Sequence, residues 1–96
     1  MNKYEAMFIV KPDLSEDDRK TLFSQMSDAV TKGKGEVLQA AVWAEKRKLG
    51  FRIKKCDDGV YYLMKFSMPA DALVELRNVY KLNENILRVL ITRQEQ

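Results

Sequence analysis

The chain alternates between strand-like and helix-like patterns in an order that few folds can accommodate. Residues 4–10 are rich in aromatic and branched apolar side chains, which predicts a strand that stops before the turn residues 11–13. Apolar residues then recur at helical spacing over residues 16–32, and Ser15 is placed to cap that helix. A second extended pattern covers residues 36–53. The first half of the chain therefore predicts a strand, a helix and a long strand.

The extended run over residues 36–53 is too long to be a flat strand. We expect a bend or β-bulge near residues 44–46, because a bulge lets a long strand twist and change direction. Residues 54–59 are expected to form the turn of a hairpin, in which the adjacent acids Asp57 and Asp58 serve as turn formers. The strands on the two sides of this turn should then pair with each other.

A third strand, a second helix and a fourth strand complete the pattern. The third strand is predicted over residues 60–66, and Pro69 suits the first turn of the helix that follows. Residues 83–85 should end that helix, and residues 86–93 form the last strand. This order predicts an α+β fold: a ferredoxin-like βαββαβ sandwich, with a four-stranded antiparallel sheet and two helices on one face.

Length and composition predict one folded domain over residues 1–96. Hydrophobic residues make up 46% of the chain and charged residues 32%, as in folded proteins rather than disordered ones. No apolar run approaches the length of a membrane span, and the N-terminus lacks the pattern of a secretory signal. We therefore expect a cytoplasmic protein with no membrane partner.

A sheet that carries both helices on one face leaves its other face open. Strand pleating assigns to the helix-packed side Ala6, Phe8, Val10, Tyr62, Met64, Phe66, Val89 and Ile91. The open side receives Met7, Ile9, Tyr61, Leu63, Lys65, Leu90 and Thr92. Because a monomer seldom exposes so large an apolar patch, we expect a protein partner to cover it. The alternatives are self-association and an unusually apolar free surface. The candidate partner-binding residues are Met7, Ile9, Tyr61, Leu63, Lys65 and Leu90.

Positive charge is concentrated in one short segment, residues 46–55. This segment holds six basic residues and no acid, whereas the whole chain has a net charge of only +3, so the rest of the chain is net negative. A local positive stripe suits a polyanion, because neutralising phosphates releases counterions. The candidate RNA-binding residues are Lys46, Arg47, Lys48, Arg52, Lys54 and Lys55. Lys3 and Arg93 would extend this patch if adjacent central and edge strands bring the two chain ends together.

The residues for enzyme chemistry are largely missing. The chain has no histidine and a single cysteine, Cys56, which leaves neither an internal disulfide nor a common zinc site. No nucleophile is paired with a base in the sequence, and Asp57 and Asp58 are interpreted as turn residues rather than metal ligands. We therefore expect no catalytic residue, no metal, no cofactor and no small-molecule substrate.

Several segments in order resemble one family, the bacterial small-subunit ribosomal protein numbered six. The resemblance covers nearly the whole chain. It is carried by Met1-Asn2-Lys3-Tyr4-Glu5, Pro12-Asp13-Leu14, the block from Arg47 to Lys55 that is similar to the family's R-x-L-A-Y-x-I-x-K, Gly59-Val60-Tyr61-Tyr62, Met68-Pro69 and Asn85-Ile86-Leu87-Arg88-Val89. The resemblance implies a structural role in the small ribosomal subunit. It further implies binding to the central domain of 16S rRNA together with the small-subunit ribosomal protein numbered eighteen.

Two other protein classes share this element order. An RRM stacks bases on aromatic residues of its central strands, but Gly59-Val60-Tyr61-Tyr62-Leu63 matches its third-strand motif only loosely. An acylphosphatase-like enzyme needs a glycine-rich phosphate loop after its first strand, where this chain has Lys11-Pro12-Asp13-Leu14. Both remain alternatives at the level of sequence.

Overall fold

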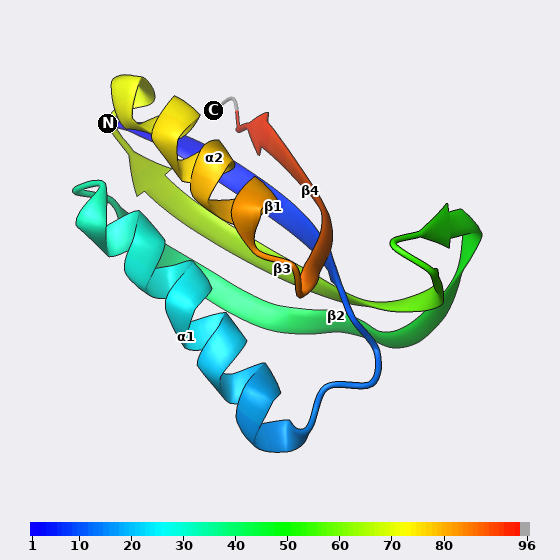
Figure 1. Ribbon diagram of the computed structural model, residues 1–96. Helices are drawn as coiled ribbons and strands as arrows, with labels where there is room; N and C mark the ends of the chain where they lie inside the picture. Colours follow the sequence, from blue (N-terminus) through cyan, green and yellow to red (C-terminus); the bar gives the residue numbers. More distant parts are fainter. Residues whose placement is uncertain (95–96) are drawn as a thin grey trace.

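The computed structural model describes residues 1–94 and has the predicted architecture. Its elements in chain order are β1 (Asn2–Val10), α1 (Glu16–Lys32), β2 (Glu36–Ile53), β3 (Cys56–Met68), a short 3₁₀ turn (Ala70–Ala72), α2 (Leu73–Leu82) and β4 (Ile86–Arg93). The strands form one sheet in the order β2-β3-β1-β4, and each neighbouring pair is antiparallel. Both helices cover the same face of this sheet (Figure 1). The prediction of a ferredoxin-like α+β sandwich is confirmed.

Helix α1 begins and ends where the sequence predicts. The Ser15 side chain accepts a hydrogen bond of 3.1 Å from the backbone N–H of Asp18, which satisfies one of the free donors at the helix start. Three acids in the first turn, Glu16, Asp17 and Asp18, complement the positive end of the helix dipole. The face that packs on the sheet buries Leu22, Met26 and Val30.

Helix α2 is shorter than the sequence suggests at its start. Pro69 precedes a 3₁₀ turn rather than the α-helix itself, which begins at Leu73. The predicted apolar face is present, because Leu76 and Tyr80 are buried. The Tyr80 hydroxyl donates a 2.6 Å hydrogen bond to the carbonyl oxygen of Met26, and this contact ties α2 to α1.

The two faces of the sheet are divided as strand pleating predicts. The core contains the predicted residues Ala6, Phe8, Val10, Tyr62, Met64, Phe66 and Ile91, with Val89 packed against them and with Tyr4, Val60 and Met68 added. The alternate residues of the same strands point to the other face, which no element of the described chain covers. This uncovered face is called the open face below.

The hairpin turn between β2 and β3 is tighter than predicted. It consists of two residues, Lys54 and Lys55, whose φ angles are 49° and 67°. Two successive positive φ angles are typical of the two-residue type I′ turn, whose twist matches that of paired strands. Asp57 and Asp58 therefore lie within β3, and the prediction that they form the turn is wrong. The sequence signal fails because turn-favouring residues continue into the start of β3, where one side of the strand is exposed and the other only half-buried.

Strand β2 bends where the sequence predicts a bulge. Its pairing with β3 shifts register between Val42 and Ala44 and again between Ala44 and Arg47. Each shift inserts an extra residue into β2 and increases its twist. The far end of the hairpin extends past the other strands, and its tip curls back toward them (Figure 1).

Candidate nucleic-acid interface and docking face

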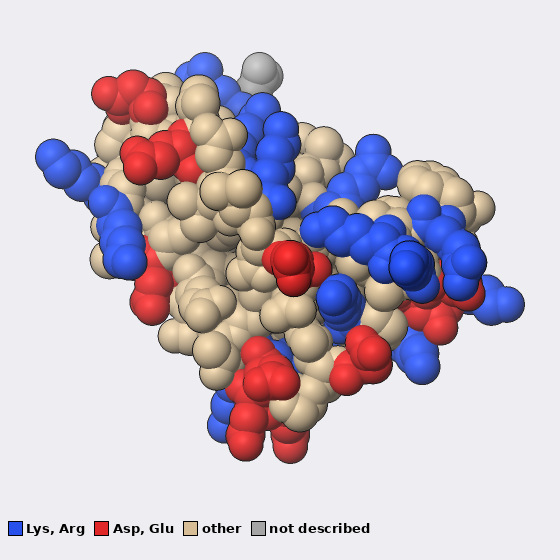
Figure 2. Space-filling view, in the orientation of Figure 1, with Lys and Arg blue, Asp and Glu red and all other residues tan. Residues whose placement is uncertain are grey.

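The far end of the β2–β3 hairpin, residues 46–59, projects beyond the rest of the sheet. Strand β1 pairs with β3 only as far as the pair Val10 and Val60, so this segment has no third strand beside it. We call residues 46–59 the arm. In Figure 2, basic side chains gather over the arm on the right, whereas acidic ones gather at the start of α1 at the bottom. The arm is therefore a positively charged projection.

The arm brings the predicted basic cluster together and adds two acids to it. Four of its basic side chains are exposed and have no ion pair in the structure of residues 1–94: Lys46, Arg47, Lys48 and Lys55. The Arg52 Nε atom lies 3.1 Å from Asp57 Oδ1, and Lys48 is paired in register with Asp58. The acids that were predicted as turn formers thus partly balance the charge of the arm.

Lys54 has a structural contact of its own. Its Nζ donates a 3.1 Å hydrogen bond to the carbonyl oxygen of Ile86, the first residue of β4. This bond joins the tip of the arm to the start of a strand on the opposite edge of the sheet. Lys54 is consequently less available to a phosphate than the four exposed basic residues.

Lys3 and Arg93 meet, but at the other end of the sheet from the arm. The Gln94 N–H donates to the Lys3 carbonyl oxygen at 2.9 Å, and an Arg93 Nη donates to Asn2 Oδ1 at 3.1 Å. Figure 1 shows both termini at the upper left and the arm at the right. Roughly 20 Å of strand β1 separates the two places, at about 3.3 Å per residue. Lys3 and Arg93 are therefore brought together as expected but lie apart from the arm, and a contact of these two residues with RNA stays a prediction.

The open face carries the predicted docking residues in cross-strand rows. Leu63, Met7 and Leu90 are successive partners across β3, β1 and β4. Tyr61 and Ile9 form the next row, and Lys65 lies opposite Glu5 in the row on the other side. All of these side chains are half-buried except Leu90, which is 63% exposed. The open face is thus a mostly apolar strip that runs across the two central strands to the edge strand β4.

Two residues that the sequence analysis did not assign, Trp43 and Arg88, lie at the two ends of the row formed by Tyr61 and Ile9. Trp43 lies beside Tyr61, with ring centroids 5.9 Å apart, and the Arg47 guanidinium carbon is 4.9 Å from the centre of the Trp43 ring. On the other side, Ile9 separates Tyr61 from Arg88 in the same row. Alternation along β4 would have assigned Arg88 to the open face together with Leu90. The position of Trp43 depends on the β2 bulge, which sequence does not locate to the residue.

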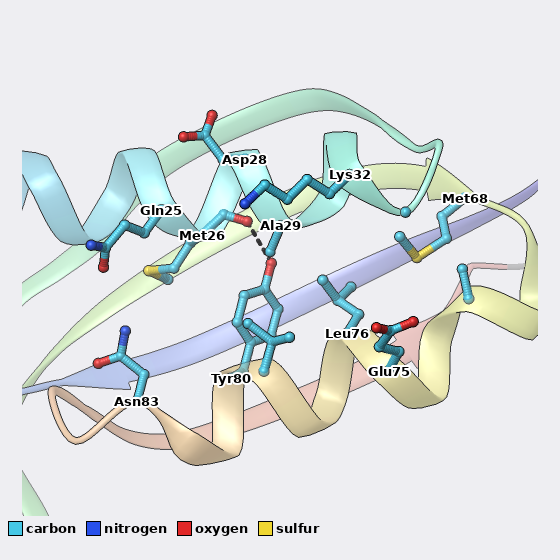
Figure 3. A pocket seen from close by; sticks show the side chains of 13 residues that line it. Gln25, Met26, Asp28, Ala29, Lys32, Met68, Glu75, Leu76, Tyr80 and Asn83 are labelled. Carbon is cyan, nitrogen blue, oxygen red and sulfur yellow. Dashed lines mark hydrogen bonds between the residues drawn. The ribbon is translucent and has the colours of Figure 1, made fainter.

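A cavity of about 390 Å³ lies between the two helices, on the opposite side of the sheet from the open face. Figure 3 shows Met26, Leu76 and Tyr80 at its apolar wall, with Asp28 and Glu75 at its rim. Burial raises the pKa of Tyr80, and the nearby Tyr62 raises it further. This side chain stays neutral and serves as the hydrogen-bond donor to Met26 described above.

Within residues 1–94 the structure holds no group of three or more histidine, cysteine, aspartate or glutamate side chains that could bind a metal ion. No helix in this part of the chain is long and apolar enough to cross a membrane.

Known proteins match this chain along nearly its whole length. A family model described as "Ribosomal protein S6" matches residues 3–93. The small ribosomal subunit protein bS6 of Thermoanaerobacter pseudethanolicus is 38% identical over 96 residues and covers all of both chains. The bS6 protein of Dictyoglomus turgidum is 40% identical over 96 residues, which is 98% of its length.

The solved structure of 30S ribosomal protein S6 from Thermotoga maritima has the same fold. It superposes with a TM-score of 0.87 at 29% sequence identity, over 97% of this chain and 87% of the other. The predicted resemblance is confirmed, and neither the RRM nor the acylphosphatase-like enzyme is needed to explain the sequence. Members of this family are structural proteins of the small ribosomal subunit rather than enzymes. The chain belongs to the ribosomal protein S6 family.

Proposed function

We propose that the protein binds the central domain of 16S rRNA together with the small-subunit ribosomal protein numbered eighteen, as part of a cytoplasmic ribosome. The whole chain acts as one rRNA-binding domain. Its arm contacts phosphates, and its open face receives the protein partner. Membership of the ribosomal protein S6 family supports the ribosomal setting. The assignment of RNA to the arm and of the protein partner to the open face rests on the residues of this chain.

The observation that carries the RNA half of the proposal is the projecting arm, whose four exposed basic residues have no ion pair within residues 1–94. A narrow projection can follow an RNA groove, where lysine acts as a point charge and arginine can bind a phosphate with two donors. The acidic start of α1 lies elsewhere on the molecule and would be repelled by RNA. The charge distribution therefore orients the protein with its arm toward the nucleic acid.

The open face supports the protein half of the proposal. Its central row of Leu63, Met7 and Leu90 is apolar, and Leu90 remains largely exposed in the isolated chain. Burying such a strip against another protein removes apolar surface from water, which is the main favourable term in protein association. Because the arm extends from the same sheet, one partner could contact the open face while the arm holds RNA.

The RNA half is tested by the salt dependence of binding to the rRNA central domain. Changing Lys46, Arg47, Lys48 and Lys55 together to Gln should weaken binding and reduce the slope of log K against log salt by roughly 0.7 to 0.9 for each phosphate that is no longer neutralised. The matched control changes four exposed lysines outside the arm, Lys20, Lys32, Lys34 and Lys81, to Gln and removes the same charge. Equal slopes for the two variants would show that net charge, and not the arm, governs binding.

The protein half is tested by the coupling between partner and RNA. In the unaltered protein, adding the protein partner should tighten rRNA binding at least tenfold, a coupling of about 1.4 kcal/mol. Leu63→Lys should abolish this gain, because a charge would be placed in a dry contact. Val74→Lys is the control, since Val74 is 69% exposed on α2, away from the open face. Thermal unfolding of both variants should show that the helix-packed core is intact. Loss of partner coupling in both variants, or in neither, would contradict the assignment of the open face.

A further inference from the structure

Trp43 is an exposed aromatic residue in an ordered setting. Its side chain is 54% exposed, yet it lies against two other groups: the Tyr61 ring, tilted by 59°, and the Arg47 guanidinium. We call Trp43, Arg47 and Tyr61 the aromatic ladder. An arginine within about 6 Å of an indole centre gains a cation–π attraction, which limits the rotamers of both side chains. The ladder is thus held in place without being buried.

The backbone explains why the indole lies beside Tyr61. The register of β2 against β3 shifts between Val42, which pairs with Tyr62, and Ala44, which pairs with Tyr61, so Trp43 is the extra residue of the bulge. Bulges of this kind redirect a side chain and occur often beside functional sites. Val42, just before the bulge, packs against the core. Trp43 follows Val42, so alternation along the strand places it on the open side of the sheet, where it lies beside Tyr61.

The surroundings of the aromatic ladder are positively charged. Lys46 and Lys48 flank Arg47 in the sequence, and both are exposed. Arg88 follows Tyr61 and Ile9 in the same cross-strand row. An apolar protein side chain that covered the indole would have to remove water from these charges, whereas a nucleotide brings a phosphate along with its base.

We propose that the aromatic ladder is a stacking platform for one unpaired nucleobase of RNA, with the Trp43 indole as the contact surface and Arg47 and Tyr61 as the groups that position it. This proposal rests on the proposed RNA-binding function and adds to it a contact with a base. Stacking on an aromatic side chain tolerates any base, because each base has a π-face. Arg47 has a second role here, since its guanidinium can bind the phosphate of the stacked nucleotide.

The test compares two short single-stranded RNAs with the same number of phosphates, one with normal bases and one made of abasic nucleotides. Trp43 is the only tryptophan in the chain, so intrinsic tryptophan fluorescence reports on it alone. The RNA with bases should quench this fluorescence at saturation. The abasic RNA should bind through the arm and leave the fluorescence largely unchanged.

Variants then separate stacking from charge, with the affinity measured by anisotropy of labelled RNA. Trp43→Leu should weaken binding of the normal RNA about tenfold and leave binding of the abasic RNA within about twofold. Trp43→Phe keeps an aromatic face and should restore part of the affinity that Trp43→Leu removes. Leu38→Ala is the matched control, because Leu38 is 49% exposed on the same strand but far from the arm. This control should leave both affinities unchanged.

Three outcomes would overturn the platform. They are an equal loss of affinity for the two RNAs in Trp43→Leu, no loss for either, or unchanged RNA binding with a weakened affinity for the protein partner. The third outcome would place Trp43 in the docking face instead. A failure of the proposed function would look different. Both RNAs would then bind the variant with Gln at positions 46, 47, 48 and 55 with the same salt slope as the unaltered protein.

Discussion

Two glycines of this chain, Gly35 and Gly50, differ in how much space a side chain would have at their positions. A Cβ atom at Gly35 would lie 2.6 Å from the Ser67 carbonyl oxygen and 2.8 Å from a methyl group of Val30. A Cβ atom at Gly50, on the arm, would have nothing within 4 Å. Gly35 therefore permits β2 to start close against β3 and the end of α1. At Gly50, by contrast, no neighbouring atom requires a glycine.

We expect opposite effects from the same substitution at these two glycines. Gly35→Ala should lower the free energy of unfolding by about 1 to 3 kcal/mol, because the backbone of β3 would have to move away from the new methyl group. Gly50→Ala should be neutral or stabilise by up to about 1 kcal/mol, since it restricts the unfolded chain and clashes with nothing. Urea denaturation of both variants measures the difference. A tolerated Gly35→Ala would mean that β2 and β3 are less tightly joined at this point than the structure indicates.

At the scale of elements, the arm uses turn residues that are poor for a stable hairpin. A type I′ turn favours Asn-Gly, because both central residues need a positive φ, yet this chain has Lys54-Lys55 there. Each lysine in the left-handed region costs roughly 1 kcal/mol relative to glycine. The binding role proposed for the arm would account for this choice, because the turn then keeps two positive charges at its tip.

Replacing the turn lysines one at a time should separate strain from contact. Lys55→Gly should stabilise the arm by about 1 kcal/mol through relief of strain. Lys54→Gly should give a smaller gain, because it also removes the hydrogen bond from Lys54 Nζ to the Ile86 carbonyl oxygen. Hydrogen exchange of the arm amides reports local opening directly. Equal gains in protection for the two variants would mean that the bond to Ile86 contributes nothing to the position of the arm.

At the scale of the whole molecule, buried tyrosines make the stability of the fold decrease at alkaline pH. Burial raises the pKa of Tyr62 and, more strongly, that of Tyr80 above the ordinary value of 10.0. The folded protein therefore keeps these protons at a pH where the unfolded chain loses them. Stability is complete below about pH 10 and falls as the pH rises above it.

The alkaline loss of stability should be largely traceable to Tyr80. Above pH 10 this residue should contribute a slope of up to about 1.4 kcal/mol per pH unit to the free energy of unfolding. Tyr80→Phe should cost about 1 kcal/mol at pH 7, because it removes the hydrogen bond to Met26, and should flatten the alkaline slope. Denaturant unfolding between pH 8 and pH 11 provides the measurement. An unchanged slope in Tyr80→Phe would assign the pH dependence to other groups.

The sequence by itself determined the order of the elements, most of their bounds and the two faces of the sheet. Helix α1 and strands β2 and β4 begin and end as predicted, because caps, turn residues and periodicity act over a few neighbouring residues. The core and open faces follow from alternation, which needs no knowledge of the partner strand. The basic segment could also be identified from the sequence, because charged residues can be counted without a structure.

Only the tertiary structure decided which of these residues lie together. The position of the hairpin turn, the place of Trp43 beside Tyr61 and the inclusion of Arg88 in the same row depend on the register between strands. Lys3 and Arg93 are separated from the arm because the direction of β1 carries the chain ends to the opposite end of the sheet. Register and direction are set by contacts between residues far apart in sequence, and local patterns do not contain them.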